Sequence, residues 1–250
     1  MRQLTAQDHA KEKRMNKKTI LIFDLDDTLY DRAEPFRKAL EAAAGLHIEG
    51  DVRAWYGIYS RHSQEMFEAN ARGEITLEES HVFRIRHAAA ELGIHMTAEQ
   101  ELAYQRYYEQ AQKDIVMSDT MKELLSFCCE AEIQMGILTN GPVKNQNRKV
   151  QALGLEKWIP HEHIFISEGI GFTKPDVGAF HYVEKALQAR PEELCMIGDS
   201  YTSDIAGAME AGWKTIWLDK NQTETQNEGK KADLTVNTEE QLLKRIKGNG

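Results

Sequence analysis

A short apolar run that ends on a cluster of carboxylates is the feature that most limits how this chain can fold. Residues 20–23 read Ile-Leu-Ile-Phe and are followed at once by Asp24, Asp26 and Asp27. A run of this length and composition, closed by polar residues, is typical of a buried β-strand. We therefore expect a strand over residues 19–23, with its carboxyl end at Asp24.

Similar apolar runs recur along the chain, with helical periodicity between most of them. They lie at residues 133–138, 164–166, 194–197, 215–218 and, more weakly, 234–236. Strands that alternate with helices of ten or more residues form right-handed βαβ crossovers and a mostly parallel sheet. The predicted fold class is therefore α/β, a doubly wound parallel sheet, and its ligands should bind beyond the carboxyl ends of the strands.

One long segment interrupts this alternation, because its periodicity is helical throughout. The helical stretches lie at residues 36–44, 52–69, 77–92 and 98–112. A block of this length is too long for a loop, so we expect an inserted α-helical domain whose two ends return to the sheet, as in a lid. The predicted division is a disordered tail at 1–18, a catalytic core at 19–33 and 117–250, and a cap at 34–116. An exposed loop is expected at 220–231.

Composition argues against several other kinds of protein. With 40 acidic and 31 basic residues, the net charge is −9, whereas nucleic acids and anionic membranes both select a clustered positive surface. We therefore expect no nucleic-acid or membrane partner. Cys128, Cys129 and Cys195 are too few and too poorly spaced for a disulfide framework or a zinc site. Without a signal-peptide pattern or an 18-residue apolar run, the chain is expected to be soluble and cytoplasmic.

The carboxylates after the first strand form the first candidate site. Alternation along an extended chain places Asp24 and Asp26 on one side, so we expect two carboxylates in one pocket. Close like charges are unfavourable unless a cation compensates them or one carboxyl is protonated. Acidic residues can also simply end a strand, but this run, placed after a buried strand, favours a functional site.

The second strand and the third are also followed by polar residues that suit an anion. Thr139 and Asn140 offer a hydroxyl and an amide close to a helix N-terminus. Lys174 could neutralise a phosphate or a nucleophilic carboxylate, and Pro175 could start the following helix. Each feature alone is equally well explained as an ordinary turn or as an exposed lysine.

The 194–197 run is followed by Gly198, Asp199 and, about one helical turn later, Asp204. We expect Gly198 to relieve the backbone at the turn. Two further carboxylates near Asp24 provide hard oxygen ligands, which suggest Mg²⁺. A helix cap would explain Asp199 by itself, but four such segments in this order are unlikely to occur together by chance.

In this order the four segments resemble the motifs of the haloacid dehalogenase (HAD) superfamily, over about residues 19–245. The resemblance implies that Asp24 is a nucleophile and metal ligand. It makes Asp26 the general acid/base, with its backbone carbonyl on the metal, and Asp199 a further ligand. Asp204 would support the metal shell as a ligand or through water or Lys174. The phosphoryl group would be held by Thr139, Asn140 and Lys174.

The function expected from this resemblance is that of a Mg²⁺-dependent phosphatase. Phosphatases of this superfamily need an acid two residues after the nucleophile to protonate a leaving alkoxide, and dehalogenases do not, so Asp26 favours a phosphatase. The expected substrate is a small phosphomonoester, a nucleoside or sugar monophosphate, hydrolysed through an aspartyl phosphate. A phosphomutase, a phosphonate hydrolase with Lys38 or Lys113 as its Schiff-base lysine, and a non-catalytic binding module are the alternatives.

Residues that select the substrate are expected in the helical cap. Arg53, Arg61, His62 and Arg72 are candidates, with the solvated face of an amphipathic helix as the alternative explanation for each. The stretches 72–76 and 212–219 resemble the branch that contains pyrimidine 5'-nucleotidases and N-acylneuraminate-9-phosphatases.

Overall fold

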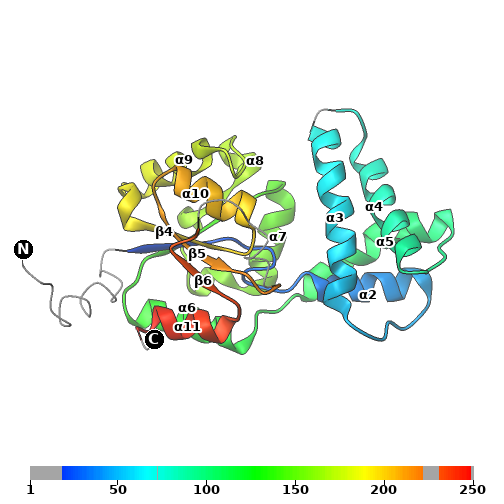
Figure 1. Ribbon diagram of the computed structural model, residues 1–250, viewed down its shortest axis with the longest axis horizontal. Helices are drawn as coiled ribbons and strands as arrows, with labels where there is room; N and C mark the ends of the chain where they lie inside the picture. Colours follow the sequence, from blue (N-terminus) through cyan, green and yellow to red (C-terminus); the bar gives the residue numbers. More distant parts are fainter. Residues whose placement is uncertain (1–18, 72, 222–230, 249–250) are drawn as a thin grey trace, which may run out of the picture. The chain divides into compact units, whose positions relative to one another are not determined.

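The computed structural model describes residues 19–71, 73–221 and 231–248. These residues form two compact units, one made of 19–30 with the chain after 115, the other of 31–115 (Figure 1). The predicted tail at 1–18, the candidate Arg72 and most of the predicted loop at 220–231 lie outside the described residues.

The larger unit is built on a six-stranded parallel sheet, which confirms the predicted doubly wound fold. Its strand order is β3-β2-β1-β4-β5-β6. The strands are β1 (Ile20–Phe23), β2 (Met135–Thr139), β3 (Ile164–Ile166), β4 (Leu194–Gly198), β5 (Lys214–Leu218) and β6 (Leu234–Val236). Phe23 at the end of β1 pairs in register with Ile137 of β2 and Ile197 of β4. The residues that follow these three strands therefore meet at one edge of the sheet.

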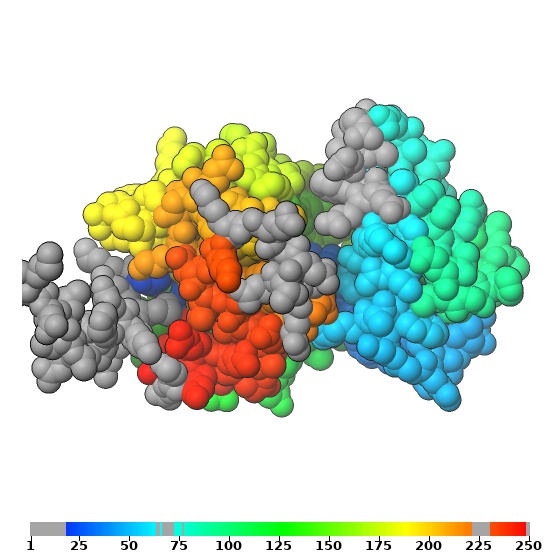
Figure 2. Space-filling model, in the orientation of Figure 1, coloured from blue at the N-terminus to red at the C-terminus, as the bar shows by residue number. Residues whose placement is uncertain are grey.

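Helices cover both faces of the sheet, with α6 and α11 on one side and α9 and α10 on the other (Figure 1). Figure 2 shows α9 in yellow and α11 in red on the surface of this unit. On the α9 side, Phe180 and Trp213 pack edge to face with ring centroids 5.1 Å apart, in a core with residues of β1 and β4. The helices are α6 (Asp119–Glu130), α7 (Val143–Leu153), α8 (Ser167–Ile170), α9 (Val177–Leu187), α10 (Ala206–Glu210) and α11 (Glu239–Ile246).

The smaller unit is helical, with α2 (Ala33–Ala44), α3 (Val52–Ala71), α4 (Leu77–Glu91) and α5 (Ala98–Ala111). Threonines start α4 and α5, since Thr76 and Thr97 each form a capping box with the residue three positions later. Its core is aromatic, and Phe36, Tyr59 and Tyr104 are almost completely buried in it.

Short turns complete the described chain. The 3₁₀ turns are Gln112–Asp114, Leu155–Lys157, His161–His163 and Pro191–Glu193, and η5 (Tyr201–Ile205) is a π-helical turn. Within the described ranges, every helix is too short or too polar to cross a membrane.

One local prediction was wrong, because Pro175 does not start a helix. Helix α9 begins two residues later, at Val177, and the side chain of Asp176 accepts a hydrogen bond from the Gly178 amide at 2.8 Å. A carboxylate that satisfies a free amide is a strong N-cap, so the helix begins after Asp176 rather than at the proline.

Candidate active site

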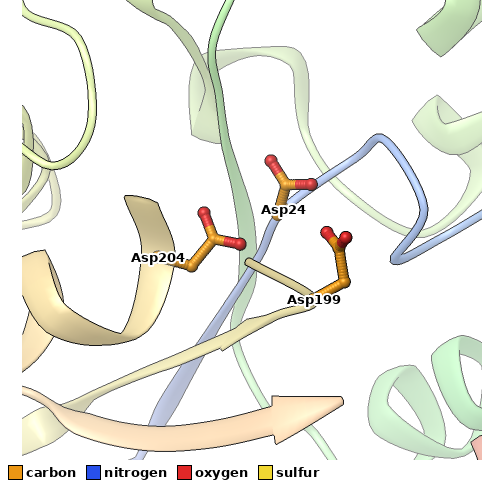
Figure 3. Close-up of side chains that lie close together, drawn as sticks. All are labelled: Asp24, Asp199 and Asp204. Atoms are coloured by element: carbon orange, nitrogen blue, oxygen red, sulfur yellow. The ribbon is translucent and has the colours of Figure 1, made fainter. Parts of the chain in front are cut away.

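Three carboxylates come together where β1 and β4 end. One oxygen from each of Asp24, Asp199 and Asp204 lies within 4.8 Å of the others. Figure 3 shows the three carboxylates turned toward a common space, with Asp24 after β1, Asp199 after β4 and Asp204 on the adjacent helical turn. Oxygen donors in a small group suit Mg²⁺, which binds few protein ligands and keeps several waters. These residues could therefore hold Mg²⁺.

Lys174 lies between two of these carboxylates. Its Nζ is 2.7 Å from Asp24 Oδ1 and 2.6 Å from Asp204 Oδ1, and its side chain is only 1% exposed. Burial acts to lower the pKa of Lys174, but the carboxylates of Asp204 and Asp24 outweigh it and raise that pKa above its usual value. The ammonium is therefore held in its charged form beside Asp24.

Asp24 itself is buried at the end of β1, and its backbone amide donates to the Ile197 carbonyl at 2.9 Å. Burial raises the pKa of Asp24 to about 7, and the charges of Asp204 and Asp26 add to the rise while Lys174 opposes it. A cation bound between the carboxylates would favour the ionised form of Asp24.

Close packing, rather than an unusual backbone angle, explains the glycine before Asp199. A Cβ on Gly198 would lie 2.2 Å from Asp204 Oδ2. The expectation that Gly198 relieves the backbone is thus replaced by a requirement for space beside Asp204. The Asp204 carboxylate is further fixed by the Ser200 amide, which donates to Oδ2 at 3.1 Å.

Asp199 is held by a side chain to which the sequence assigned no role. The Asp199 amide donates to Thr28 Oγ1 at 3.1 Å, and Thr28 Oγ1 lies 3.3 Å from Asp199 Oδ1. The indole of Trp217 donates to the Asp199 carbonyl at 2.8 Å. Thr28 is fully buried, so these bonds fix the loop after β4 to the loop after β1.

The carboxylate of Asp26 is not one of the three that lie together at Asp24, although it is close enough for its charge to raise the pKa of Asp24. The two carboxylate oxygens of Asp26 lie 2.7 and 2.8 Å from Lys149 Nζ, and Gln146 Nε2 donates to Oδ2 at 3.1 Å. The Tyr30 hydroxyl donates to Oδ1 as well. The chain turns sharply at Asp27, whose φ is 61°, and this turn brings Tyr30 back to Asp26.

Thr139 and Asn140, at the end of β2, have different partners. Gln146 Nε2 donates to Thr139 Oγ1 at 2.6 Å. The Asn140 side chain exchanges two 2.9 Å hydrogen bonds with the backbone of Lys174. Its side-chain amide therefore positions Lys174, and a contact of Asn140 with a phosphate stays a prediction.

Two important residues, Gln146 and Lys149, were missed from the sequence. They lie on α7 at the spacing i and i+3, and Val150 and Leu153 continue the same buried stripe. A glutamine and a lysine on an otherwise apolar stripe were the signal that could have identified them, because charged side chains are rarely buried unless they are paired.

The residues proposed to select the substrate form ion pairs within the helical unit. Arg53 pairs with Asp31, and both Arg61 and His62 lie close to Glu91. Arg53 and Arg61 are exposed, as expected of a helix surface, whereas His62 is buried. The ion pairs of these three residues within their own unit provide no support for a role in binding the substrate.

Comparison with known proteins identifies the family. The family model for haloacid dehalogenase-like hydrolases matches residues 18–212. The chain belongs to this family. The predicted HAD membership is thereby confirmed, and the site at the end of β1 lies within the matched segment of this HAD-like hydrolase.

Several relatives of this HAD-like hydrolase are named as phosphatases. The chain is 30% identical to the HAD-hydrolase YfnB of Bacillus subtilis, with 82% of this chain and 85% of that protein covered. It is 29% identical to the glyceraldehyde 3-phosphate phosphatase of Pyrococcus furiosus, with 82% of each covered. Identity to the human N-acylneuraminate-9-phosphatase is 24%, with 80% and 82% covered.

The fold is shared with solved HAD structures. That of YfnB, bound to magnesium, has a TM-score of 0.68 at 25% identity and covers 91% of this chain and 98% of that one. An L-2-haloacid dehalogenase has a TM-score of 0.71 at 16% identity, with 92% and 98% covered, which shows the fold alone.

Proposed function

We propose that the protein is a Mg²⁺-dependent phosphatase that hydrolyses small phosphomonoesters through an aspartyl phosphate on Asp24. The observation that carries this proposal is the buried contact between Asp24 and Lys174, beside the carboxylates of Asp199 and Asp204. In this proposal, the unit that contains the sheet is the catalytic core, and the helical unit is the cap.

Asp24 is assigned the role of nucleophile. Its free oxygen attacks phosphorus, the phosphorus–oxygen ester bond breaks, and the leaving alkoxide takes a proton from Asp26, which acts here in its protonated, carboxylic acid form. Water then attacks the phosphorus of the aspartyl phosphate and gives its proton to Asp26, so that inorganic phosphate leaves and both aspartates are regenerated. Thr139 and Lys174 hold the phosphoryl oxygens during both transfers.

Asp24 and Asp199 are assigned as the side-chain metal ligands, with the Asp26 carbonyl as a third. When bound, Mg²⁺ neutralises the negative charge of the phosphate and of the carboxylates. Asp204 is assigned a supporting role, because its oxygens already accept hydrogen bonds from Lys174 and the Ser200 amide.

The contacts in the chain weigh against a phosphonate hydrolase. A Schiff-base lysine needs an apolar pocket that lowers its pKa. Lys38 and Lys113 are both exposed, and they contact Glu34 and Gln110. A dehalogenase needs no general acid two residues after the nucleophile, so the presence of Asp26 favours the phosphatase over that alternative as well.

The substrate class is supported by the relatives, which are named for phosphorylated small molecules such as glyceraldehyde 3-phosphate. We propose a sugar or nucleoside monophosphate. A cytoplasmic location is part of the proposal, and three unpaired cysteines agree with a reducing compartment.

The test is to assay the purified protein with magnesium against a panel of sugar, sugar-acid and nucleoside monophosphates. Phosphate release from at least one, absent in Asp24→Asn, is the expected result. Turnover that survives in Asp24→Asn would remove Asp24 as nucleophile. A panel without any turnover would favour the non-catalytic alternative.

A further inference from the structure

Two polar side chains of helix α7, Gln146 and Lys149, contact residues of the proposed site. Gln146 and Lys149 are only 2% and 7% exposed and lie one helical turn apart. Lys149 is an ion-pair partner of Asp26, and Gln146 contacts both Asp26 and Thr139. Both side chains thus reach groups to which the proposed reaction assigns roles, although neither belongs to the four motifs.

The contacts of Gln146 determine which way its amide points. Its Nε2 lies 2.6 Å from Thr139 Oγ1, 3.1 Å from Asp26 Oδ2 and 3.1 Å from the Asn140 carbonyl. A carbonyl and a carboxylate are acceptors only, so the group that faces them must be the NH₂ and not the amide oxygen.

This orientation of the amide determines which partner donates in the hydrogen bond between Gln146 and Thr139. The Gln146 NH₂ has two protons for three acceptors, and its shortest contact, at 2.6 Å, is with Thr139 Oγ1, to which it can only donate. A threonine hydroxyl has a single proton. Because Thr139 Oγ1 accepts from Gln146, its own proton is left to donate to another group. A phosphoryl oxygen beyond the end of β2 is such an acceptor. Gln146 thereby fixes Thr139 as a donor toward the substrate.

Lys149 restrains the carboxylate of Asp26. It contacts both oxygens of Asp26, at 2.7 and 2.8 Å, and its side chain is 9% exposed. A buried, charge-assisted pair of this kind restricts the rotamer of the aspartate more strongly than a solvated contact does. The position of the Asp26 carboxylate therefore depends on a lysine from another element of the sheet unit.

We propose that Gln146 and Lys149 are positioning residues, Gln146 orienting the Thr139 hydroxyl toward the phosphoryl group and Lys149 holding the carboxylate of Asp26. The proposal rests on the proposed phosphatase function, since it assigns roles to side chains that support that reaction.

The first test measures binding of inorganic phosphate, with magnesium, by calorimetry. Gln146→Met keeps nearly the same volume and loses the NH₂, so we expect phosphate affinity to fall ~10-fold, as is usual on losing a hydrogen bond to a charged group. Gln151→Met, on the exposed face of the same helix, is the matched control and should bind as the wild type does. Equal affinity in all three proteins, or no phosphate binding by the wild type, overturns the role of Gln146.

Melting temperature separates positioning from packing. Gln146→Met should melt within a few degrees of Gln151→Met, since its shape is kept. If it melts far lower, Gln146→Glu is the second variant, because it keeps the glutamine shape without a donor. Phosphate affinity equal to the wild type in that variant would contradict the proposal.

The second test compares kcat/KM for an alkyl phosphate and for 4-nitrophenyl phosphate. An aryl leaving group needs little protonation, whereas an alkoxide needs Asp26, so Lys149→Met should lower kcat/KM ~10-fold more for the alkyl ester. Lys149→Arg retains a cation and should restore part of the loss. Lys144→Met, at an exposed lysine of α7, is the control.

The outcomes distinguish this proposal from the function on which it rests. If the wild type hydrolyses neither ester, the phosphatase assignment fails, and the phosphate-binding experiment still decides the role of Gln146. If the wild type hydrolyses both and Lys149→Met lowers both equally, the phosphatase assignment stands and Lys149 does not position Asp26.

Discussion

The ammonium of Lys174 lies 2.7 Å from the carboxylate of Asp24, and the two side chains are 1% and 10% exposed. The second partner of Lys174 is Asp204, whose side chain is 2% exposed. One buried cation thus compensates two buried anions, so the stability of the folded protein depends on Lys174. Removing the shared cation leaves two buried carboxylates without a counter-charge, whereas removing one carboxylate leaves Lys174 paired with the other.

Lys174→Met is therefore expected to lower the free energy of unfolding by ~3 to 5 kcal/mol in the absence of magnesium. Urea denaturation in EDTA measures this value. Lys185→Met, at an exposed lysine of α9, should change it little. The double variant Lys174→Met, Asp204→Asn should recover part of the loss, and a double variant as unstable as the single one would argue against charge as the cause.

Asp24→Asn should abolish turnover and leave the fold intact. An amide is a poor nucleophile for phosphoryl transfer, so we expect kcat to fall below a tenth of the wild-type value. The variant also removes one of two carboxylates that repel each other near Lys174. Its melting temperature in EDTA should accordingly be no lower than that of the wild type. A clearly lower melting temperature would show that the ion pair of Asp24 with Lys174 stabilises the fold more than the repulsion between Asp24 and Asp204 destabilises it.

Chelation should remove activity, and magnesium should restore it, because the proposed ligands are hard carboxylate oxygens. In Asp199→Asn the magnesium concentration for half-maximal activity should rise ~10-fold or more, as a charged ligand is lost. The control is Asp119→Asn, a fully exposed carboxylate in the first turn of α6. Full activity after rigorous chelation would exclude the metal from the reaction.

The main features of the sheet and the carboxylate group could be predicted from the sequence. Apolar runs mark buried strands, and parallel topology brings the residues that follow them to one edge, so Asp24, Asp199 and Asp204 could be placed together before any coordinates were known. Both features follow from the local sequence pattern and from the right-handed βαβ connections of a parallel sheet.

Contacts between distant segments could not be predicted in the same way. Asn140 looked like a phosphate donor, and its use for the Lys174 backbone depends on a loop 34 positions away. Gln146 and Lys149 fall on the apolar stripe of α7, but their partner Asp26 lies 120 and 123 positions away, so the contacts themselves could not be predicted from local pattern. Pro175 was the expected start of α9, and the sequence pattern did not single out Asp176, whose side chain caps the helix.

The last prediction concerns His81 on α4, in the helical unit. Burial lowers the pKa of His81 from 6.5 to about 4, Arg84 lowers it further, and Glu109 acts in the opposite direction. As the pH falls, His81 therefore takes up a proton in the unfolded protein before it does so in the folded protein. Its contribution to stability is complete above pH 6.5 and is lost progressively between pH 6.5 and 4.

A proton NMR titration of the folded protein should place the midpoint of His81 near 4. In His81→Gln, the free energy of unfolding should depend less on pH across this window, whereas His95→Gln, at an exposed histidine of the same unit, should keep the wild-type slope. A His81 midpoint close to 6.5 would contradict the burial argument.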